Sequence, residues 1–340
     1  MLRRRSLIRS VAAAAMAWPF VSACGESQAG PEAKSLVVYS GRSEFLVGPL
    51  IEQFGSTAGV DVRVKYAGTP QLAAVLLEEQ GSSPADVFFA QEPGGLGVVE
   101  GLLAPMPEAL LKGVPSWARS PDGLWTGVSG RARVIVYNTD RLVPDDLPTD
   151  LWGLTESTWR GRVGWPPTNA SFQTMVTGMR AMWGDEQTRE WLVAMQANEP
   201  VSYPRNTPIV AAVAAGEIDV GLVNHYYLHR FLAEQGEAFP ARNHHLVDGG
   251  PGSLVMVAGI GILRSAVNRG EAEQFVELLL SMIGQQYFAS QTYEYPLIDG
   301  VATGRALTPI SEINKPVIAL NDLKDIAVTQ GMLRAVGVLS

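Results

Sequence analysis

The chain has 340 residues, of which 46% are hydrophobic and 18% are charged. This balance supports a substantial buried core and excludes an intrinsically disordered chain. Lys and Arg number 26 against 34 Asp and Glu, which argues against a nucleic-acid-binding protein because phosphates require a basic face. The single cysteine excludes a disulfide framework and any cysteine-cluster zinc or iron–sulfur site.

The first residues have the organisation of an export signal. Arg3-Arg4-Arg5 form a basic start, residues 11–18 form an apolar stretch, and Val21-Ser22-Ala23-Cys24 follows. The apolar stretch is too short to span a bilayer as a helix, so residues 1–23 are predicted to be a cleaved signal peptide. Without them the chain carries a net charge of −12.

Cys24 stands where a bacterial lipoprotein carries its modified cysteine, after the small residues Ser22 and Ala23. We expect residues 24–34 to be a lipid-anchored tether. The anchored protein would lie on the outer face of the cell membrane or in the periplasm. The alternative is that Cys24 is incidental and the protein is secreted free.

From Ser35 onward, β-rich runs alternate with helical segments. The predicted strands are 36–39, 60–64, 85–89, 134–137, 163–165, 219–223 and 254–262. The predicted helices are 45–54, 71–79, 171–182, 186–195, 208–215, 227–234, 271–282 and 322–336. The order predicts an α/β fold, in which parallel strands have helices on their faces.

The carboxyl ends of parallel strands are where ligands bind in such sheets. After strand 219–223 comes Asn224-His225-Tyr226-Tyr227, at the start of a predicted helix. The positive end of a helix dipole favours phenolates, and two phenolates favour a hard trivalent cation such as ferric iron. The alternatives are that the tyrosines stack on a sugar, hydrogen-bond an organic ligand or simply pack.

Three further segments offer groups for an anion. Asn169-Ala170-Ser171 opens a predicted helix, where free N–H groups bind anions, although ordinary capping explains the same residues. Arg131 precedes strand 134–137 and suits either an anion or an ion pair between lobes. Asn206 stands at another predicted helix start.

Two carboxylates follow the first and third strands. Glu44 lies in Ser40-Gly41-Arg42-Ser43-Glu44, and Glu92 follows Ala90-Gln91. Each carboxylate is expected near the presumed ligand-binding cleft at the carboxyl ends of the strands. The alternative is that each is a solvated residue in the first turn of a helix.

Catalytic motifs are absent from the sequence: it has no G-x-S-x-G elbow, no P-loop and no H-E-x-x-H. His225 and His229 have the i, i+4 spacing of a metal pair but lack a third ligand. We therefore predict that the protein is not an enzyme, with an exported hydrolase or lyase that uses His225 as the remaining alternative.

The chain resembles the ferric-iron-binding periplasmic proteins of ABC importers, which belong to the type II solute-binding proteins. The segment that carries the resemblance most specifically is Asn224-His225-Tyr226-Tyr227. Other matching stretches are Val37-Val38-Tyr39-Ser40-Gly41, Pro84-Ala85-Asp86-Val87-Phe88, Ser129-Gly130-Arg131-Ala132-Arg133-Val134, Gly161-Arg162-Val163-Gly164, Gly250-Pro251-Gly252-Ser253-Leu254-Val255 and Glu294-Tyr295-Pro296-Leu297.

The resemblance implies that Tyr226 and Tyr227 bind Fe3+. It places a synergistic anion, phosphate or carbonate, on Arg131, Asn169, Ala170, Ser171 and Asn206. The chain departs from the family by having Ser43, Gln91 and Ser171 where other members have metal ligands. Glu44 and Glu92 are expected to replace them. The alternative is that the anion and water complete the coordination shell of the metal.

The resemblance also implies a two-lobed fold with hinge strands between the lobes. We expect one lobe to comprise residues 35–130 and about 254–305, and the other 131–253 and about 306–340. The expected protein is a monomer that closes on ferric iron and delivers it to an ABC importer permease. The same fold would also serve a receptor for thiamine, a polyamine or a phosphonate.

Overall fold

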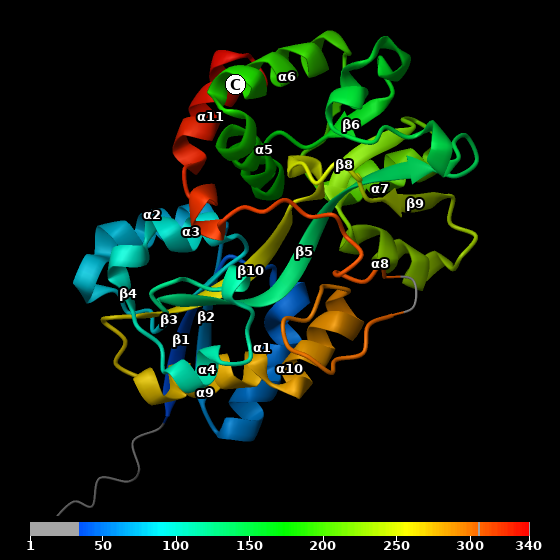
Figure 1. Ribbon diagram of the computed structural model, residues 1–340. Helices are drawn as coiled ribbons and strands as arrows, with labels where there is room; N and C mark the ends of the chain where they lie inside the picture. Colours follow the sequence, from blue (N-terminus) through cyan, green and yellow to red (C-terminus); the bar gives the residue numbers. More distant parts are fainter. Residues whose placement is uncertain (1–33, 305–306, 340) are drawn as a thin grey trace, which may run out of the picture. The chain divides into compact units, whose positions relative to one another are not determined.

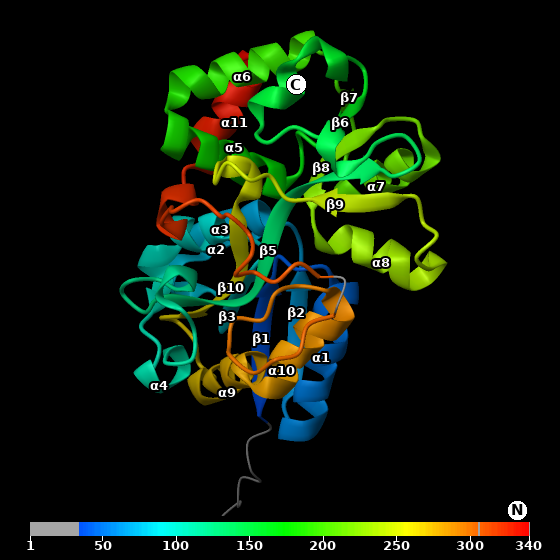
Figure 2. The same ribbon diagram turned by 45° about the vertical axis from the view of Figure 1, so that its right-hand side comes forward.

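A computed structural model describes residues 34–304 and 307–339 of the chain. The predicted signal peptide, Cys24 and all but the last residue of the expected tether lie outside the described residues. The ribbon in Figures 1 and 2 shows a central sheet with helices on both of its faces.

The described residues form ten strands and eleven α-helices. The strands are β1 (Ser35–Ser40), β2 (Asp61–Tyr66), β3 (Val87–Ala90), β4 (Leu103–Ala104), β5 (Trp125–Asn138), β6 (Val163–Trp165), β7 (Val201–Ser202), β8 (Val220–Asn224), β9 (Ala241–His244) and β10 (Val255–Leu263). The helices are α1 (Glu44–Ala58), α2 (Thr69–Glu79), α3 (Pro93–Val98), α4 (Glu108–Leu111), α5 (Ala170–Trp183), α6 (Asp185–Ala197), α7 (Asn206–Ala215), α8 (Tyr226–Gln235), α9 (Arg269–Leu280), α10 (Met282–Tyr287) and α11 (Ile326–Ala335).

The first half of the sheet has the order β2-β1-β3-β10. β1 pairs in parallel with β2 and β3, and β10 runs antiparallel to β3. Alternate residues of β1 enter two different cores, with Leu36 and Val38 packing against α1 and α9, and Tyr39 against α2 and α3. This alternation is expected of a strand that is buried on both faces.

The second half of the sheet has the order β5-β8-β6-β7. β6 is parallel to β7 and β8, whereas β5 is antiparallel to β8. Val134 and Val136 of β5 pack with α7 and α8, while Ile135 faces the core of α5, α6 and α11. This half is therefore also a sheet covered by helices on both faces.

β5 connects the two halves. Its residues Trp125–Ala132 pair with β10, and its residues Arg133–Tyr137 pair with β8. Strand prediction found only 134–137, because the small and charged residues before it have low strand propensity. Arg131 is therefore inside a 14-residue strand rather than before one, at the point where β5 changes partners.

The predicted helices match the observed ones in position, with ends displaced by a few residues. The largest difference is at the C-terminus, where the predicted helix 322–336 is a 3-10 turn over Leu320–Leu323 followed by α11. Within the described ranges, no helix has the length and apolar character needed to cross a membrane.

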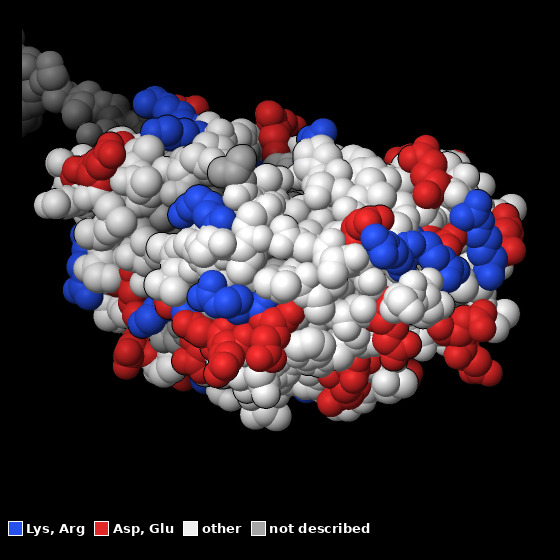
Figure 3. All heavy atoms as spheres, turned by 90° about the horizontal axis from the view of Figure 1, so that it is seen from above, with Lys and Arg blue, Asp and Glu red and all other residues white. Residues whose placement is uncertain are grey.

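Acidic and basic side chains are interspersed on the face shown in Figure 3. In the same fold, Arg180 of α5 pairs with Asp185 at 2.8 Å and with Asp325 at 3.3 Å. Ion pairs at the surface contribute little stability individually.

Candidate metal centre

Tyr226 and Tyr227 lie where β8 turns into α8. β8 is a fully buried strand between β5 and β6, and His225 separates it from the helix. The two tyrosine rings are stacked, with centroids 4.3 Å apart and an interplanar angle of 29°. Tyr226 is buried, and Tyr227 is only partly exposed. The sequence therefore placed this pair correctly at the first turn of a helix.

Burial raises the pKa of Tyr227 well above its ordinary value of 10, and the hydroxyl of Tyr226 acts in the same direction. Arg131 and Arg42 oppose this effect by favouring the phenolate. Tyr227 is therefore protonated at neutral pH until a cation replaces the proton. A bound trivalent cation would supply the charge that burial otherwise withholds.

Three buried arginines surround the tyrosine pair. Arg42 follows β1, while Arg131 and Arg133 stand two residues apart on β5 and therefore on one face of it. Burial lowers the pKa of Arg133 to about 9, although Tyr226 and Tyr227 act to raise this pKa. From the sequence, Arg42 has no assigned role and, of the two β5 arginines, the anion is assigned to Arg131 alone.

Several N–H groups of these arginines have no hydrogen-bond partner among the described residues. They are Nε and Nη1 of Arg131, Nε and Nη2 of Arg133, and Nε of Arg42. Unpaired buried donors are costly and are normally satisfied by a ligand or water. Their concentration beside the tyrosines is the feature expected of a site that also receives an anion.

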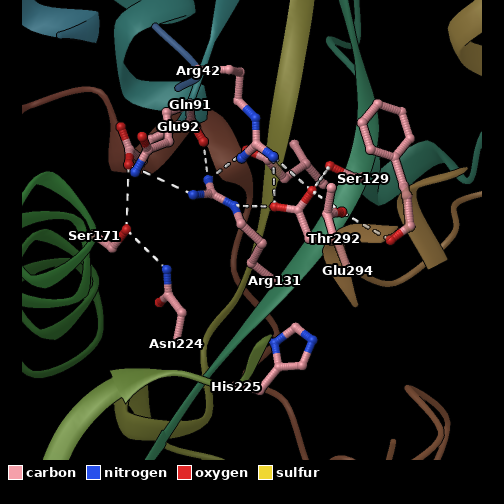
Figure 4. Close-up of polar contacts among 12 residues, drawn as sticks. Arg42, Gln91, Glu92, Ser129, Arg131, Ser171, Asn224, His225, Thr292 and Glu294 are labelled. Atoms are coloured by element: carbon pink, nitrogen blue, oxygen red, sulfur yellow. Dashed lines mark hydrogen bonds and ion pairs between the residues drawn. The ribbon is translucent and has the colours of Figure 1, made fainter. Parts of the chain in front are cut away.

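Glu294 and Glu92 lie on opposite sides of Arg131 (Figure 4). One nitrogen of Arg42, Nη2, donates to both carboxylate oxygens of Glu294, at 2.8 and 2.7 Å. Ser129 and Thr292 each donate to Glu294 at 3.0 Å. The chain thus has a second buried site carboxylate that sequence reasoning missed, because its partners are distant in the sequence.

Glu92 is buried and has fewer partners than Glu294. The Ser171 hydroxyl donates to it at 3.3 Å, and Nη1 of Arg131 lies 3.8 Å from its carboxylate. Burial raises the pKa of Glu92, although Arg131 and Arg42 act to lower it. Glu92 also lines a cavity of about 200 Å³ between α2 and α3 on one side and α5 and α11 on the other.

The predicted anion loop is at the start of α5. Asn169 caps the helix, its side chain accepting from the Ser171 N–H at 3.0 Å. Asn224 donates to the Ser171 hydroxyl at 3.1 Å, which links this loop to the end of β8 (Figure 4). Ala170 is the first residue of α5 and is partly exposed.

Asn206 is the first residue of α7 rather than its cap, which is Arg205. The Asn206 side chain is fully buried, and neither its oxygen nor its nitrogen has a hydrogen-bond partner among the described residues. Such a side chain is available for a ligand. Asn206 therefore does not cap α7.

Glu44 has a different environment from Glu92. It is exposed in the first turn of α1. Burial raises the pKa of Tyr66, and the charge of Glu44 acts in the same direction. The adjacent Phe45 ring contacts the guanidinium of Arg230 on α8, with the carbon 4.2 Å from the ring centroid. The structure thus places Glu44 at the surface next to α8, and its role as a ligand stays a prediction.

His225 is not a free base. Its Nδ1 accepts from the Ala132 N–H at 3.1 Å, and its Nε2 bonds the Tyr293 carbonyl at 2.8 Å. Burial lowers the pKa of His225 well below its ordinary value, although its bonds to Tyr293 and Ala132 act to raise it. In the part of the chain that the structure describes, no three His, Cys, Asp or Glu side chains form a metal-binding group.

Comparison with known proteins identifies the family of this fold and site. The profile of the family described as "Bacterial extracellular solute-binding protein" matches residues 81–320. The chain belongs to this family. Because these are solute-binding proteins, the prediction of a binding protein rather than an enzyme is confirmed.

Curated relatives of this solute-binding protein carry names that refer to iron. The "Major ferric iron-binding protein" of Neisseria meningitidis serogroup B is 31% identical over 87% of this chain and 91% of its own length. The "Fe(3+)-binding periplasmic protein" of Serratia marcescens is 29% identical over 91% and 92%. The predicted relationship to ferric-iron-binding periplasmic proteins is therefore confirmed.

Solved structures confirm the two-lobed α/β fold. Iron-bound HitA from Pseudomonas aeruginosa superposes with a TM-score of 0.85 and is 33% identical, over 89% of this chain and 99% of its own. A Trichodesmium protein in complex with iron and citrate ligands has a TM-score of 0.77 and 27% identity, over 89% and 99%.

Proposed function

We propose that this solute-binding protein captures ferric iron between Tyr226 and Tyr227 and delivers it to an ABC importer permease. The observation that carries the proposal is the stacked tyrosine pair at the start of α8, surrounded by three buried guanidinium groups. Phenolate oxygens are hard ligands suited to Fe3+. The names of the relatives support the same cargo.

We further propose that a synergistic anion, phosphate or carbonate, completes the site. Its partners would be Arg131, Asn169, Ala170, Ser171 and Asn206. The unpaired N–H groups of Arg131 and the unpaired amide of Asn206 support this assignment. Three buried guanidiniums against the buried carboxylates of Glu92 and Glu294 also leave an excess of positive charge, which an anion and two phenolates would offset.

Glu92 and Glu44 remain the proposed carboxylate ligands. Glu92 has the stronger support because it is buried beside Arg131 and lines a cavity. Glu44 would have to reach the metal from the surface of α1.

Proton release is a consequence of this chemistry. Because burial raises the pKa of Tyr227 well above its ordinary value, iron that binds the Tyr227 phenolate releases a proton. Iron affinity is therefore expected to rise with pH over the range in which ferric iron is kept soluble by a chelator.

A ferric titration of residues 25–340, followed by visible absorbance with and without phosphate or bicarbonate, tests the proposal. We expect a tyrosinate-to-iron charge-transfer band that saturates at one equivalent. The band should be lost in the variant Tyr226→Phe/Tyr227→Phe and kept in Tyr137→Phe, which removes a tyrosine hydroxyl from a core position on β5.

Absence of the band, together with failure to compete with citrate for iron, would overturn the iron assignment. The protein would then be a receptor for an organic solute. Asn206→Ala tests the anion separately, because its amide has no partner to lose in the structure. Loss of the anion dependence, with the band retained, is the expected result.

We propose that a lipid on Cys24 anchors the protein to the membrane that holds the permease. We also propose that the protein is a monomer. The protein would close two lobes on the cargo. One lobe comprises residues 35–130 and about 254–305, and the other comprises 131–253 and about 306–340. Cys24→Ser should move the protein from the membrane fraction to the soluble fraction. An unchanged distribution would contradict the lipid anchor.

A further inference from the structure

The short segment from Tyr293 to Tyr295 contacts the start of α8 and the arginine group, by which we mean the buried Arg42, Arg131 and Arg133. It follows a π-helix over Phe288–Thr292, and Tyr293 has a φ of +57°. Left-handed backbone is unfavourable for a bulky residue, and π-helical turns occur frequently at functional sites. A strained conformation of this kind persists only where the surrounding contacts enforce it.

On one side, Glu294 holds the arginines. Its four closest polar partners are all buried. Arg42, Ser129 and Thr292 donate hydrogen bonds to it, and Nε of Arg131 lies 3.9 Å from its Oε1. Arg42 comes from the loop after β1, and Arg131 comes from β5. One carboxylate therefore pairs with two guanidiniums, through hydrogen bonds from Arg42 and through charge alone with Arg131 (Figure 4). Both guanidiniums favour the phenolate form of Tyr227.

On the other side, the residues flanking Glu294 hold the start of α8. The Tyr293 carbonyl bonds His225 at 2.8 Å, and the Tyr295 ring stacks on the His225 ring with centroids 4.5 Å apart. Tyr295 is also hydrogen-bonded to Gly130 of β5 through both its backbone N–H and its carbonyl. His225 immediately precedes Tyr226, so the segment fixes the backbone from which the tyrosines project.

We propose that Glu294 is a positioning residue for the cation site, acting through Arg42 and Arg131 and through the attachment of its segment to His225. It does not contact the cargo itself. This inference rests on the proposed function in naming iron as the cargo, but the positioning contacts exist without it.

The physical reason is the cost of an unbalanced buried charge. With a neutral side chain at 294, Arg42 and Arg131 lose their shared counter-charge while remaining buried. The guanidiniums and the segment then move apart, and the shift reaches His225 and the tyrosines. Residues that orient metal ligands without touching the metal typically change metal affinity by about 10- to 100-fold when mutated.

The test compares Glu294→Gln with Glu294→Asp and with Asp219→Asn. Asp219 is a matched control because it is a buried carboxylate paired with Arg141 and Arg162, at the end of β8 away from the tyrosines. We expect Glu294→Gln to weaken iron binding about 10- to 100-fold and to shift the charge-transfer band. Glu294→Asp should recover part of the affinity, and Asp219→Asn should match the wild type.

A double-mutant cycle tests whether Glu294 acts through Arg42. If it does, Arg42→Gln/Glu294→Gln loses no more affinity than the worse single variant, because the two residues share one effect. Losses that multiply in the double variant would overturn the proposal. Wild-type affinity and an unshifted band in Glu294→Gln would overturn it as well.

Hydrogen exchange of the iron-free protein separates this inference from the proposed function. Amides of residues 225–229 should exchange faster in Glu294→Gln than in the wild type or in Asp219→Asn. Equal exchange overturns the positioning role, whereas faster exchange in a protein that binds no iron overturns only the cargo. If Glu294→Gln does not fold, Ser129→Ala, which removes one hydrogen bond to Glu294, is expected to show the same changes with smaller amplitude.

Discussion

The two sides of Arg131 differ in how completely their carboxylate is satisfied. Glu294 receives hydrogen bonds from Arg42, Ser129 and Thr292 and is fully buried. Glu92, on the other side, has one long hydrogen bond from Ser171 and lines a cavity. One carboxylate is thus built into the structure, while the other retains acceptor capacity for a ligand.

This difference shows that burial alone does not identify a functional carboxylate. Both side chains are at least nine-tenths buried and both face the same arginine. Their hydrogen-bond partners and the cavity beside Glu92 distinguish them. We infer that the Glu294 side contributes stability and geometry, whereas the Glu92 side is open to the cargo.

Arg42→Met should have the largest effect on stability, because it leaves Glu294 buried without its main counter-charge. We expect a decrease of about 3–5 kcal/mol in the free energy of unfolding. Urea unfolding monitored by circular dichroism measures it. A loss below about 1 kcal/mol would mean that Glu294 is satisfied without Arg42.

Ser129→Ala should have the second largest effect. It removes one hydrogen bond to the ionised Glu294, and we expect a loss of about 2 kcal/mol by the same urea measurement. A neutral result would show that Thr292 and Arg42 are sufficient for this carboxylate.

Asp219→Asn is expected to cost about 1 kcal/mol, because the partner arginines are substantially exposed. Burial acts to raise the pKa of Asp219, but hydrogen bonds from Arg141 and Arg162 outweigh it and lower the pKa below the ordinary 3.8. The wild type's advantage should therefore be complete above the unfolded-state pKa and disappear as the pH falls through the folded-state pKa. Unfolding free energies of both proteins between pH 2 and 7 give this profile, and an advantage that persists at the acid end would contradict it.

Glu92→Gln should have the smallest effect on stability, within about 1 kcal/mol, because an amide replaces a carboxylate whose charge is poorly compensated. Its iron affinity should nevertheless fall, as measured by competition with citrate. A large loss of stability with unchanged iron affinity would contradict the inference that the Glu92 side is open to the cargo.

The region around α8 could be predicted well from local sequence. A buried strand, two tyrosines and a helical pattern over 227–234 were enough to place the tyrosine pair at the start of a helix. Asn169 as a helix cap was predictable for the same reason, since capping is a local interaction that depends on a few adjacent residues.

The arginine group could not be predicted in this way. Arg42 and Glu294 are 252 positions apart in the chain, and Arg131 was placed before a strand because its neighbours are poor strand formers. β5 extends through that segment because pairing with β10 outweighs the weak local propensity.

The sequence by itself determined the alternation of strands and helices, the position of the tyrosine pair and the acidic, cysteine-poor composition, since each depends on residue type and short spacing. Only the tertiary structure decided which charged side chains surround the tyrosines and which of the two buried carboxylates is satisfied. The physical reason is that buried charges are stabilised by partners from distant segments, and those partners meet only when β5 and β10 bring the two halves of the sheet together.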